Sequence, residues 1–376
     1  MDEHLMKEDG NGRGGLGVVV VVVLHPPLCF SLQRTSNLSP FWEFSIMFLH
    51  ALLLLHVSAV SSSISCQDDQ GTPVDWFYLY KLPHLPRQPV EDGLKYIFME
   101  GQSEGWIDGK TLLNDTRSAV GRTVGPLYEG GEVGYVLYND QPPDQELSGA
   151  AGGSCGHTKG VLVFDKQQGF WLVHSTPHFP PPNSAGQYSY PHSGASNGQN
   201  FICVTYPFER FQTIVEDILS TLAGTVGEQL KINQPHVYDC SVPVSLASAV
   251  PALSHLCKQS EPKLNSTSSS LPSNRSVSLL SLTGTEFISF AKGASFSSGE
   301  RITFKATEDH SKWAVSTRAS SGWVCVGDIN RDKAEENRGG GTVCRKDDVV
   351  WKAYRTAALQ CQSCGGETQS CEQDIL

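Results

Sequence analysis

The sequence predicts an α/β fold with mixed sheets, built as two related halves within one chain. Three observations support this prediction. A His-x-Lys segment occurs twice, and short apolar runs bounded by Gly, Pro and polar turns are typical of strands. One longer stretch at 208–230 has apolar residues at every third or fourth position, which is typical of a helix. With 39% hydrophobic and 18% charged residues, the 376-residue chain has an ordinary globular composition and ample length for a core.

The first copy of the duplicated segment, GHTKGVLVFDKQQGFWLVHS, covers residues 156–175. A shift of 153 residues places His157 on His310 and Lys159 on Lys312. Each copy continues as an apolar run, a turn and a second apolar run, which predicts a β-hairpin after each motif. A single His-x-Lys occurs easily by chance, and a repeat can be purely structural. Two copies in register nevertheless indicate one supersecondary unit that is used twice.

The chemistry of the repeat follows from its spacing. Residues i and i+2 of a strand face the same side, so each copy presents an imidazole beside an ammonium group. Cleavage of a phosphodiester requires charge neutralisation, a nucleophile and a proton donor for the leaving oxygen. Two histidines and two lysines supply all three without a metal or a cofactor. The predicted catalytic residues are His157, Lys159, His310 and Lys312. One imidazole must be neutral and the other protonated, and the pattern leaves open which histidine is the nucleophile.

Other stretches predict the surrounding framework. Apolar runs at 76–82, 135–137 and 201–206 are expected to be strands, and the aromatic residues of the first are expected in the core. A Gly-rich loop at 149–156 precedes the first motif and either lets the backbone approach a phosphate or only gives flexibility. The Pro-, Ser- and Tyr-rich stretch at 177–191 is expected to be a loop. Its two tyrosines, Tyr188 and Tyr190, either stack on bases or pack within the loop.

Several features indicate the secretory route. Eleven cysteines, with Cys29 upstream of the expected mature start, favour an oxidising compartment. Sequons at Asn114, Asn265 and Asn274 predict glycosylation. The apolar run FLHALLLLHV after Met47, followed by small residues, predicts a signal peptide. We expect a lysosomal and/or secreted protein with no membrane span in its mature chain.

We divide the chain into five parts. Residues 1–46 are expected to be a non-native or unstructured extension, and 47–63 the signal peptide. Residues 64–230 are expected to form the first half, with the first motif. Residues 231–300 are expected to be a Ser-rich glycosylated connection and a shortened start of the second half, and 301–376 the second half with the second motif.

The charge of the chain bears on its substrate. A formal net charge of −11 is unfavourable for binding DNA, whose phosphates are usually met by basic surfaces. The chain also has 12 histidines, which that count treats as neutral and which become positive in acid. Binding to DNA is therefore expected to be favoured at low pH. Many secreted proteins are simply acidic, however, and composition alone does not choose between these explanations.

Five segments carry a resemblance to a known family. They are TPVDWFYLYKLP at 72–83, YVLYNDQPP at 135–143, HTKGVLVFDKQQGFWLVHSTPHFPPP from 157, EDHSKW at 308–313 and WVCVGDINRDKAEENRGGGTVC at 323–344. Together they resemble the deoxyribonuclease II (acid DNase) family over most of the chain from about residue 66 to 364. That family is similar to phospholipase D, in which two His-x-Lys motifs meet at one active site.

The resemblance implies a fold and an activity. The fold would be a phospholipase D-like pseudo-dimer of two βαβ-type halves, and the protein a monomer. The activity would be metal-independent hydrolysis of double-stranded DNA in acid, through a phosphohistidine, to 3′-phosphate and 5′-hydroxyl products, as in lysosomal DNA degradation. Candidate substrate contacts are Ser175, His178 and Asn330; the family commonly has Asn where His178 stands. The implied disulfides are Cys66–Cys203 and Cys325–Cys344.

The chain also departs from the family. The stretch between Phe290 and His310 looks short, as if a strand and a helix were absent, and 285–291 resembles the helix that precedes the family's second motif. The alternative function is therefore a catalytically impaired, secreted DNA-binding glycoprotein. A lipid phosphodiesterase is a third candidate, which the specific flanking segments disfavour.

The stretch that looks short also affects the disulfides. Cys361 or Cys364 would pair with Cys257, and the partners of the remaining cysteines, Cys155, Cys240 and Cys371, stay open.

Overall fold

The computed structural model describes residues 63–84, 93–143, 156–220, 236–257, 274–292, 309–316, 318–328, 338–357, 360–362 and 368–370. The chain divides into two units, 1–61 and 62–376, and every described residue belongs to the second. The expected extension at 1–46 and all of the expected signal peptide except Ser63 lie outside the described residues. The same holds for Asn265, Asn330, Cys155, Cys364 and Cys371.

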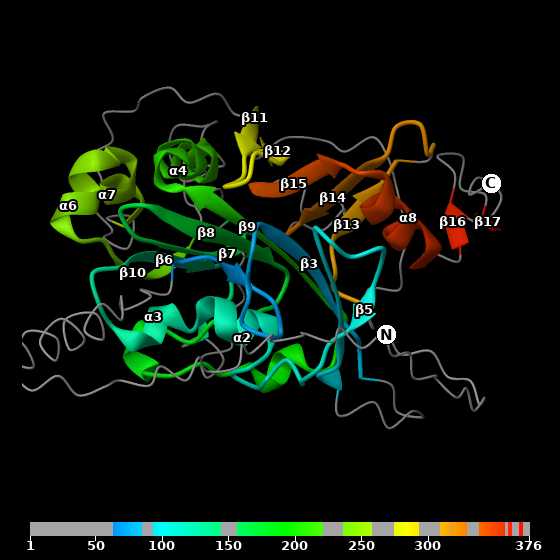
Figure 1. The fold of residues 1–376 in the computed structure, drawn as a ribbon, viewed down its shortest axis with the longest axis horizontal. Helices are drawn as coiled ribbons and strands as arrows, with labels where there is room; N and C mark the ends of the chain where they lie inside the picture. Colours follow the sequence, from blue (N-terminus) through cyan, green and yellow to red (C-terminus); the bar gives the residue numbers. More distant parts are fainter. Residues whose placement is uncertain are drawn as a thin grey trace, which may run out of the picture. The chain divides into compact units, whose positions relative to one another are not determined.

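The first motif lies in an eight-stranded sheet (Figure 1). The strand order is β10-β6-β7-β8-β9-β3-β4-β5, and every neighbouring pair is antiparallel. The strands are β3 (Trp76–Lys81), β4 (Tyr96–Glu100), β5 (Ile107–Asp108), β6 (Gly134–Asn139), β7 (Lys159–Phe164), β8 (Gln168–His174), β9 (Gln199–Pro207) and β10 (Val237–Ser241). The predicted hairpin is β7–β8, and the strands predicted at 76–82, 135–137 and 201–206 are β3, β6 and β9.

Both faces of this sheet are buried, because its strands carry apolar residues on both sides. In β3, Trp76 and Tyr78 face one hydrophobic core, and Phe77 and Leu79 face the other. The helices α2 (Ala119–Val124) and α3 (Pro126–Glu129) cover the second face, and α4 (Phe211–Ser220), α6 (Val244–Ala249) and α7 (Pro251–Cys257) lie over the first (Figure 1). The helix predicted at 208–230 is found as the short 3₁₀ turn η5 (Phe208–Arg210) followed by α4.

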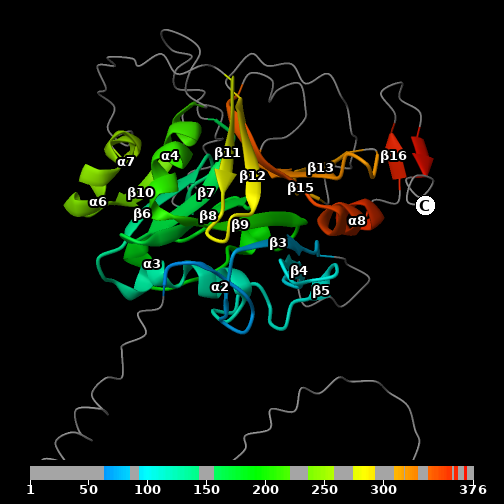
Figure 2. The same ribbon diagram turned by 45° about the horizontal axis from the view of Figure 1, so that its top comes forward.

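The second motif lies in a five-stranded antiparallel sheet of order β11-β12-β15-β14-β13. Its strands are β11 (Asn274–Leu280), β12 (Glu286–Lys292), β13 (Trp313–Val315), β14 (Trp323–Gly327) and β15 (Gly340–Lys346). The predicted second hairpin is β13–β14. The helix α8 (Asp348–Ala357) lies beside β13 (Figure 2), where the Trp313 and Tyr354 rings are 5.2 Å apart. Smaller elements are the strand pairs β1 (Cys66–Gln67) with β2 (Pro73–Val74) and β16 (Gln360–Gln362) with β17 (Thr368–Ser370), and the turns η3 (Asn183–Ala185) and η4 (His192–Gly194).

One expectation about the second half is corrected. The helix expected at 285–291 is wrong: this segment is the strand β12, paired with β11 and β15. Its buried residues Phe287, Ser289 and Ala291 alternate with more exposed ones, which is the period of a strand. The stretch 231–300, expected to be a Ser-rich glycosylated connection and a shortened start of the second half, contains β10, α6, α7, β11 and β12 among its described residues, and the proposed division of the chain stays a prediction. The mixed α/β class is confirmed, and the pseudo-dimer stays a prediction.

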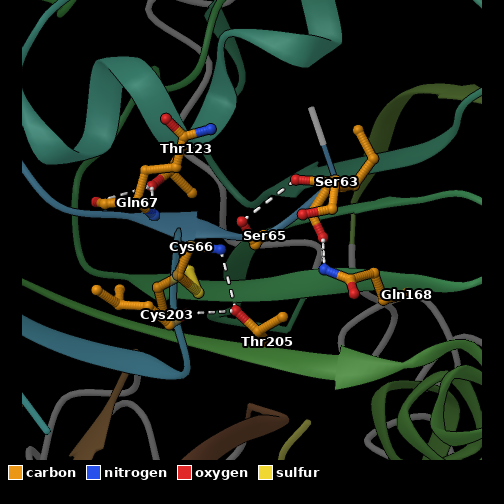
Figure 3. Close-up of a disulfide and its surroundings, with 10 residues drawn as sticks. Ser63, Ser65, Cys66, Gln67, Thr123, Gln168, Cys203 and Thr205 are labelled. Carbon is orange, nitrogen blue, oxygen red and sulfur yellow. Dashed lines mark hydrogen bonds between the residues drawn. A yellow bond between two sulfur atoms is a disulfide. The ribbon is translucent and has the colours of Figure 1, made fainter. Parts of the chain in front are cut away.

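Three disulfides join described residues. Cys66–Cys203 ties the first strand segment to β9 (Figure 3), where Cys66 N donates to Thr205 Oγ1 at 3.1 Å. Cys325–Cys344 joins directly opposed residues of β14 and β15. Both are the pairs that the family resemblance implied. The third, Cys240–Cys257, shows that the pairing of Cys257 with Cys361 or Cys364 was wrong.

The remaining expectations concern the loop and the surface. Tyr188 and Tyr190 are buried against Phe179, so packing within the loop describes both tyrosines. Asn114 and Thr116 of the first sequon are exposed, as glycosylation requires. No helix among the described residues is long and apolar enough to cross a membrane.

Candidate active site

The two motifs meet at the end of β14. Gly327 N donates to the backbone oxygen of Lys312 at 2.8 Å, which continues the β13–β14 pairing to the second motif. The next residue, Asp328, contacts the first motif through its backbone and its side chain. A second link comes from Gly339, whose carbonyl oxygen accepts from His157 N at 2.8 Å. The two His-x-Lys motifs are therefore linked through the end of β14, and Gly339 adds a second contact between the first motif and the second half.

The imidazole of His157 is held in one tautomer. Its Nδ1 lies 2.5 Å from the backbone oxygen of Asp328. A carbonyl oxygen only accepts hydrogen bonds, so Nδ1 carries the proton and the neutral ring has a lone pair on Nε2. Burial, followed by the charge of Lys159, lowers the pKa of His157 to about 3. The ring is therefore neutral in moderate acid, with a nucleophilic Nε2.

Asp140 gathers the cations around this imidazole. It follows β6 directly, and its buried carboxylate pairs with Lys159 Nζ and with Arg338 Nη2 at 2.9 Å, and lies 3.9 Å from His157 Nε2. Burial alone would raise the pKa of Asp140, but the charge of Lys159 and the hydrogen bonds from Lys159 and Arg338 hold it well below its usual range. Asp140 is thus an ionised, buried group that joins both halves of the site.

Asp328 is the second buried carboxyl group of the site. Its side chain accepts from Lys159 N at 3.3 Å and from Gly341 N at 3.1 Å. Burial raises the pKa of Asp328 to about 7, against which these hydrogen bonds and the charge of Lys159 act. In acid it is therefore largely neutral, and its main role in the geometry is to hold His157 and the backbone of Lys159.

The second motif is held by the first sheet. His310 N donates to Gly198 O at 2.9 Å, and Lys312 N donates to Asn200 Oδ1 at 2.5 Å. The Asn200 amide also donates to Gly327 O at 3.3 Å, so one buried side chain fixes both strands of the second hairpin. A Cβ on Gly198 would lie 2.5 Å from Asp309 Oδ1, which explains why a glycine is needed at this contact.

Lys312 interacts electrostatically with the first motif. Its Nζ donates to the backbone oxygen of His310. Burial, followed by the charge of Lys159, lowers the pKa of Lys312 to about 8. The charge of Lys312 also helps to lower the pKa of His157. The predicted catalytic residues His157, Lys159 and Lys312 therefore act on one another electrostatically, and the backbone of His310 is held by Gly198.

The predicted supporting residues have other partners. Ser175 is buried; its Oγ donates to Gln199 Oε1 at 2.5 Å and accepts from Asn200 N at 3.0 Å. It therefore supports the segment that holds the second motif. His178 adopts a left-handed backbone, with φ of 58°, which Asn tolerates well, and its Nδ1 contacts Pro142 O at 3.0 Å. These contacts attach His178 to the loop that follows Asp140. Asn330 lies outside the described residues.

Sequence reasoning missed four residues of the site: Asp140, Asn200, Asp328 and Arg338. Asp140 had a signal, because it is a charged residue immediately after a buried strand. Asp328 lies within the family-like segment 323–344, where nothing in the local pattern separates it from the other polar residues. Asn200 and Arg338 act across the join between the sheets, which no local pattern reveals. Among the described residues, no group of three or more His, Cys, Asp or Glu could hold a metal ion, and the expected independence from metals stays a prediction.

Comparison with known proteins decides the family. The sequence matches the family model for deoxyribonuclease II over residues 65–299 and 295–364. This chain belongs to the deoxyribonuclease II family. Its similarity to the curated members is 37% identity to mouse deoxyribonuclease-2-alpha (84% of this chain, 98% of the mouse protein) and 30% to human deoxyribonuclease-2-beta (84% and 96%). It is also 33% identical to plancitoxin-1 of Acanthaster planci (85% and 99%). The two matched stretches of the deoxyribonuclease II model meet between Phe290 and His310, where the sequence looked short.

Proposed function

We propose that this chain is a metal-independent endonuclease that hydrolyses double-stranded DNA in acid to 3′-phosphate and 5′-hydroxyl ends. The observation that carries the proposal is the 2.5 Å hydrogen bond from His157 Nδ1 to the backbone oxygen of Asp328. It supports His157 as the nucleophile, because the bond leaves the Nε2 lone pair for attack on phosphorus. The relatives named deoxyribonuclease-2 support DNA as the substrate.

The first step is the formation of a phosphohistidine. Nε2 of His157 attacks phosphorus, the bond from phosphorus to the 5′ oxygen breaks, and protonated His310 gives its proton to that oxygen. Lys159 and Lys312 stabilise the negative charge on the non-bridging oxygens. The backbone oxygen of Asp328 accepts the hydrogen bond from Nδ1–H throughout and stabilises the positive charge that develops on the ring.

The second step releases the product. Water gives a proton to His310, which is now neutral, and attacks phosphorus. The bond between phosphorus and Nε2 breaks, which leaves a 3′-phosphate on the DNA. His157 is neutral again and His310 is protonated, so both histidines have returned to their starting states.

The pH dependence follows from these two states. The lowered pKa of His157 keeps its ring neutral down to a pH of about 3. His310 must begin protonated, and an ordinary imidazole loses its proton above a pH of about 6.5. Activity is therefore expected in acid and lost toward neutral pH, with apparent pKa values that belong to the pair of histidines.

The test is cleavage of supercoiled plasmid by the purified protein at about pH 5 and at neutral pH, with excess chelator. We expect cleavage in acid, ends that carry 3′-phosphate, and loss of cleavage in His157→Ala and His310→Ala. Strict dependence on Mg²⁺, or activity that survives either substitution, would contradict the proposal. A gel shift without cleavage at any pH would favour the impaired DNA-binding glycoprotein instead. Intact motif residues and the support of His310 and Lys312 by Gly198 and Asn200 argue against that alternative.

An acidic compartment on the secretory route, lysosomal and/or extracellular, suits this chemistry. The three disulfides between described residues and the exposed Asn114 support that part of the proposal. Expression in secreting cells, followed by removal of N-linked sugars, should shift the mass of the protein. Asn114→Gln should reduce the shift, and an unchanged mass would contradict glycosylation at this site.

A further inference from the structure

The residue before the histidine differs between the two motifs. The shift of 153 residues places Gly156 of the first copy on Asp309 of the second. Gly156 has no side chain, and His157 is held instead by the backbone oxygen of Asp328. Asp309 is half-buried directly before His310. The second motif therefore has a carboxylate with no counterpart in the first, and the contacts of that carboxylate indicate its role.

The carboxylate of Asp309 closes a turn around His310. Its Oδ1 accepts from Ser311 N at 2.8 Å, and its Oδ2 accepts from Ser311 Oγ at 2.9 Å. A bond from an Asp side chain to the backbone N–H two residues later is an Asx-turn, which restricts the backbone of the residue between them. That residue is His310, whose own N donates to Gly198 O at 2.9 Å. The backbone that carries the imidazole is therefore fixed from two sides.

Tyr80 of β3 holds this carboxylate from the first half of the chain. Burial, followed by the charge of Asp309 and a hydrogen bond to its side chain, raises the pKa of Tyr80. The phenol therefore keeps its proton and donates it to the carboxylate. Both groups pack against Gly198, where a Cβ would lie 2.5 Å from Asp309 Oδ1 and 2.7 Å from the Tyr80 hydroxyl oxygen. The turn around the second histidine is thus attached to a central strand of the eight-stranded sheet.

We propose that Asp309 is a positioning residue for His310, and that Tyr80 acts through it. The inference deepens the proposed function, on which it rests, by assigning the residues that place the proton donor at the leaving oxygen. Asp309 acts through the backbone turn and needs no contact with the reacting atoms. Its charge also raises the pKa of Lys312, against burial and the charge of Lys159. The experiment must therefore separate the turn from the charge.

The first measurement is kcat and KM for DNA cleavage in acid by Asp309→Ala and Asp309→Asn. Asp309→Ala loses the turn and should lower kcat by about 10²-fold with little change in KM. Asp309→Asn loses the charge but keeps an oxygen that accepts from Ser311 N, so it should retain most of kcat. Equal losses in the two variants would overturn the proposal. The matched control is Asp68→Ala, which removes the same kind of bond, to Gln70 N at 2.8 Å, and should leave kcat unchanged.

The part of Tyr80 is tested by a double variant. Tyr80→Phe removes the hydrogen bond to the carboxylate and should lower kcat less than Asp309→Ala does. Tyr80→Phe combined with Asp309→Ala should lose little more than Asp309→Ala alone, because the two residues act as one unit. Additive losses would overturn the role of Tyr80.

A second substrate distinguishes positioning of His310 from general support of the site. The leaving group of bis(4-nitrophenyl) phosphate departs without a proton, so its first displacement needs no general acid. Asp309→Ala should therefore release the first nitrophenolate at nearly the rate of the wild type while its cleavage of DNA is slowed. Equal slowing on both substrates would overturn the proposal, because the variant would then disturb the whole site.

Failure of this proposal and failure of the proposed function give different results. A wild type that cleaves DNA, with an Asp309→Ala variant of unchanged kcat, would overturn the positioning role alone. A wild type that does not cleave DNA would contradict the proposed function, and crystal structures of both proteins would then decide the positioning. We expect a displaced His310 imidazole and an unmoved His157 in Asp309→Ala; a His310 imidazole in the same place in both proteins would overturn the inference.

Discussion

The two His-x-Lys hairpins have the same chemistry but different supports. The first, β7–β8, lies between β6 and β9 in the eight-stranded sheet, and Lys159 is fully buried. The second begins with the three-residue strand β13 at the end of the five-stranded sheet, and its residues are half-buried. The second motif depends instead on Gly198 and Asn200 of the first half. A repeated motif therefore does not require a repeated scaffold, because one half can support the other.

This asymmetry suits the two histidines to the different roles that we propose for them. His157 is buried and neutral, with its tautomer fixed by Asp328, which suits a nucleophile. His310 is more exposed than His157, which suits a group that must give a proton to a leaving oxygen and then take one from water. Three further measurements test the proposed roles of the histidines, the support of the second motif and the contact between the two halves.

The largest expected effect separates the two histidines with an activated substrate. The leaving group of bis(4-nitrophenyl) phosphate departs without a proton, so its first displacement needs no general acid. His310→Ala should release a burst of about one nitrophenolate per protein and then turn over slowly, whereas on DNA it should lose about 10²–10⁴-fold in rate. His157→Ala should show no burst on either substrate. A burst from His157→Ala and none from His310→Ala would reverse the assignment.

The next effect concerns the support of the second motif. Asn200→Leu removes the acceptor for Lys312 N and the donor to Gly327 O, and the misplaced motif should lower kcat by about 10²-fold. Asn200→Asp is the matched variant, because a protonated carboxyl group can accept one bond and donate the other. Its kcat should approach that of the wild type in acid and fall earlier as the pH rises. Equal loss in both variants at every pH would mean that Asn200 only fills space.

The smallest effect concerns stability where the two halves meet. Asp217 of α4 accepts a hydrogen bond from Ser289 of β12, and burial raises its pKa to about 6 from 3.8. The folded state therefore binds the proton of the Asp217 carboxyl group more tightly than the unfolded state does. The stabilisation of the fold by protonated Asp217 is complete below a pH of about 4 and is lost as the pH rises to about 6.

Asp217→Asn should therefore stabilise the protein more at neutral pH than in acid, by at most about 3 kcal/mol of unfolding free energy. The measurement is the melting temperature of the variant relative to the wild type at each pH. Asp239→Asn is the control, since Asp239 lies in the edge strand β10 and its carboxylate accepts from Tyr135 and Asn183 instead of from Ser289. A melting-temperature difference between Asp217→Asn and the wild type that does not change with pH would contradict the role of Asp217.

The apolar runs in the sequence predicted the central strands of the eight-stranded sheet. The apolar runs of β3, β7, β8 and β9 are buried on both faces, and the family's long motifs carried the pairing of Cys66 with Cys203. The segment 285–291 was wrongly expected to be a helix on the strength of the family resemblance. Its alternation appears only in the burial, because Ser289 faces inward while Ile288 and Phe290 are more exposed, so the order of apolar and polar residues does not reveal the strand.

For the candidate site, the sequence supplied the four motif residues, whose catalytic role stays a prediction, but not the residues that support them. His157, Lys159, His310 and Lys312 follow from the repeat alone. Asn200 acts by a side-chain bond to Lys312 N, 112 residues away, and Arg338 by an ion pair to Asp140, 198 residues away. Such contacts depend on how the two sheets pack, so the spacing of residues along the chain contains no signal for them.

The most direct measurement of the central claim is the location of the phosphorylated residue. His310→Ala protein is mixed with bis(4-nitrophenyl) phosphate in acid, quenched with alkaline denaturant and digested, and the modified peptide is found by mass spectrometry. The buried, neutral imidazole predicts a nitrophenyl phosphoryl group on His157, and none in His157→Ala protein treated in the same way. An adduct on His310 in His157→Ala protein, with none on His157 in His310→Ala protein, would contradict the account.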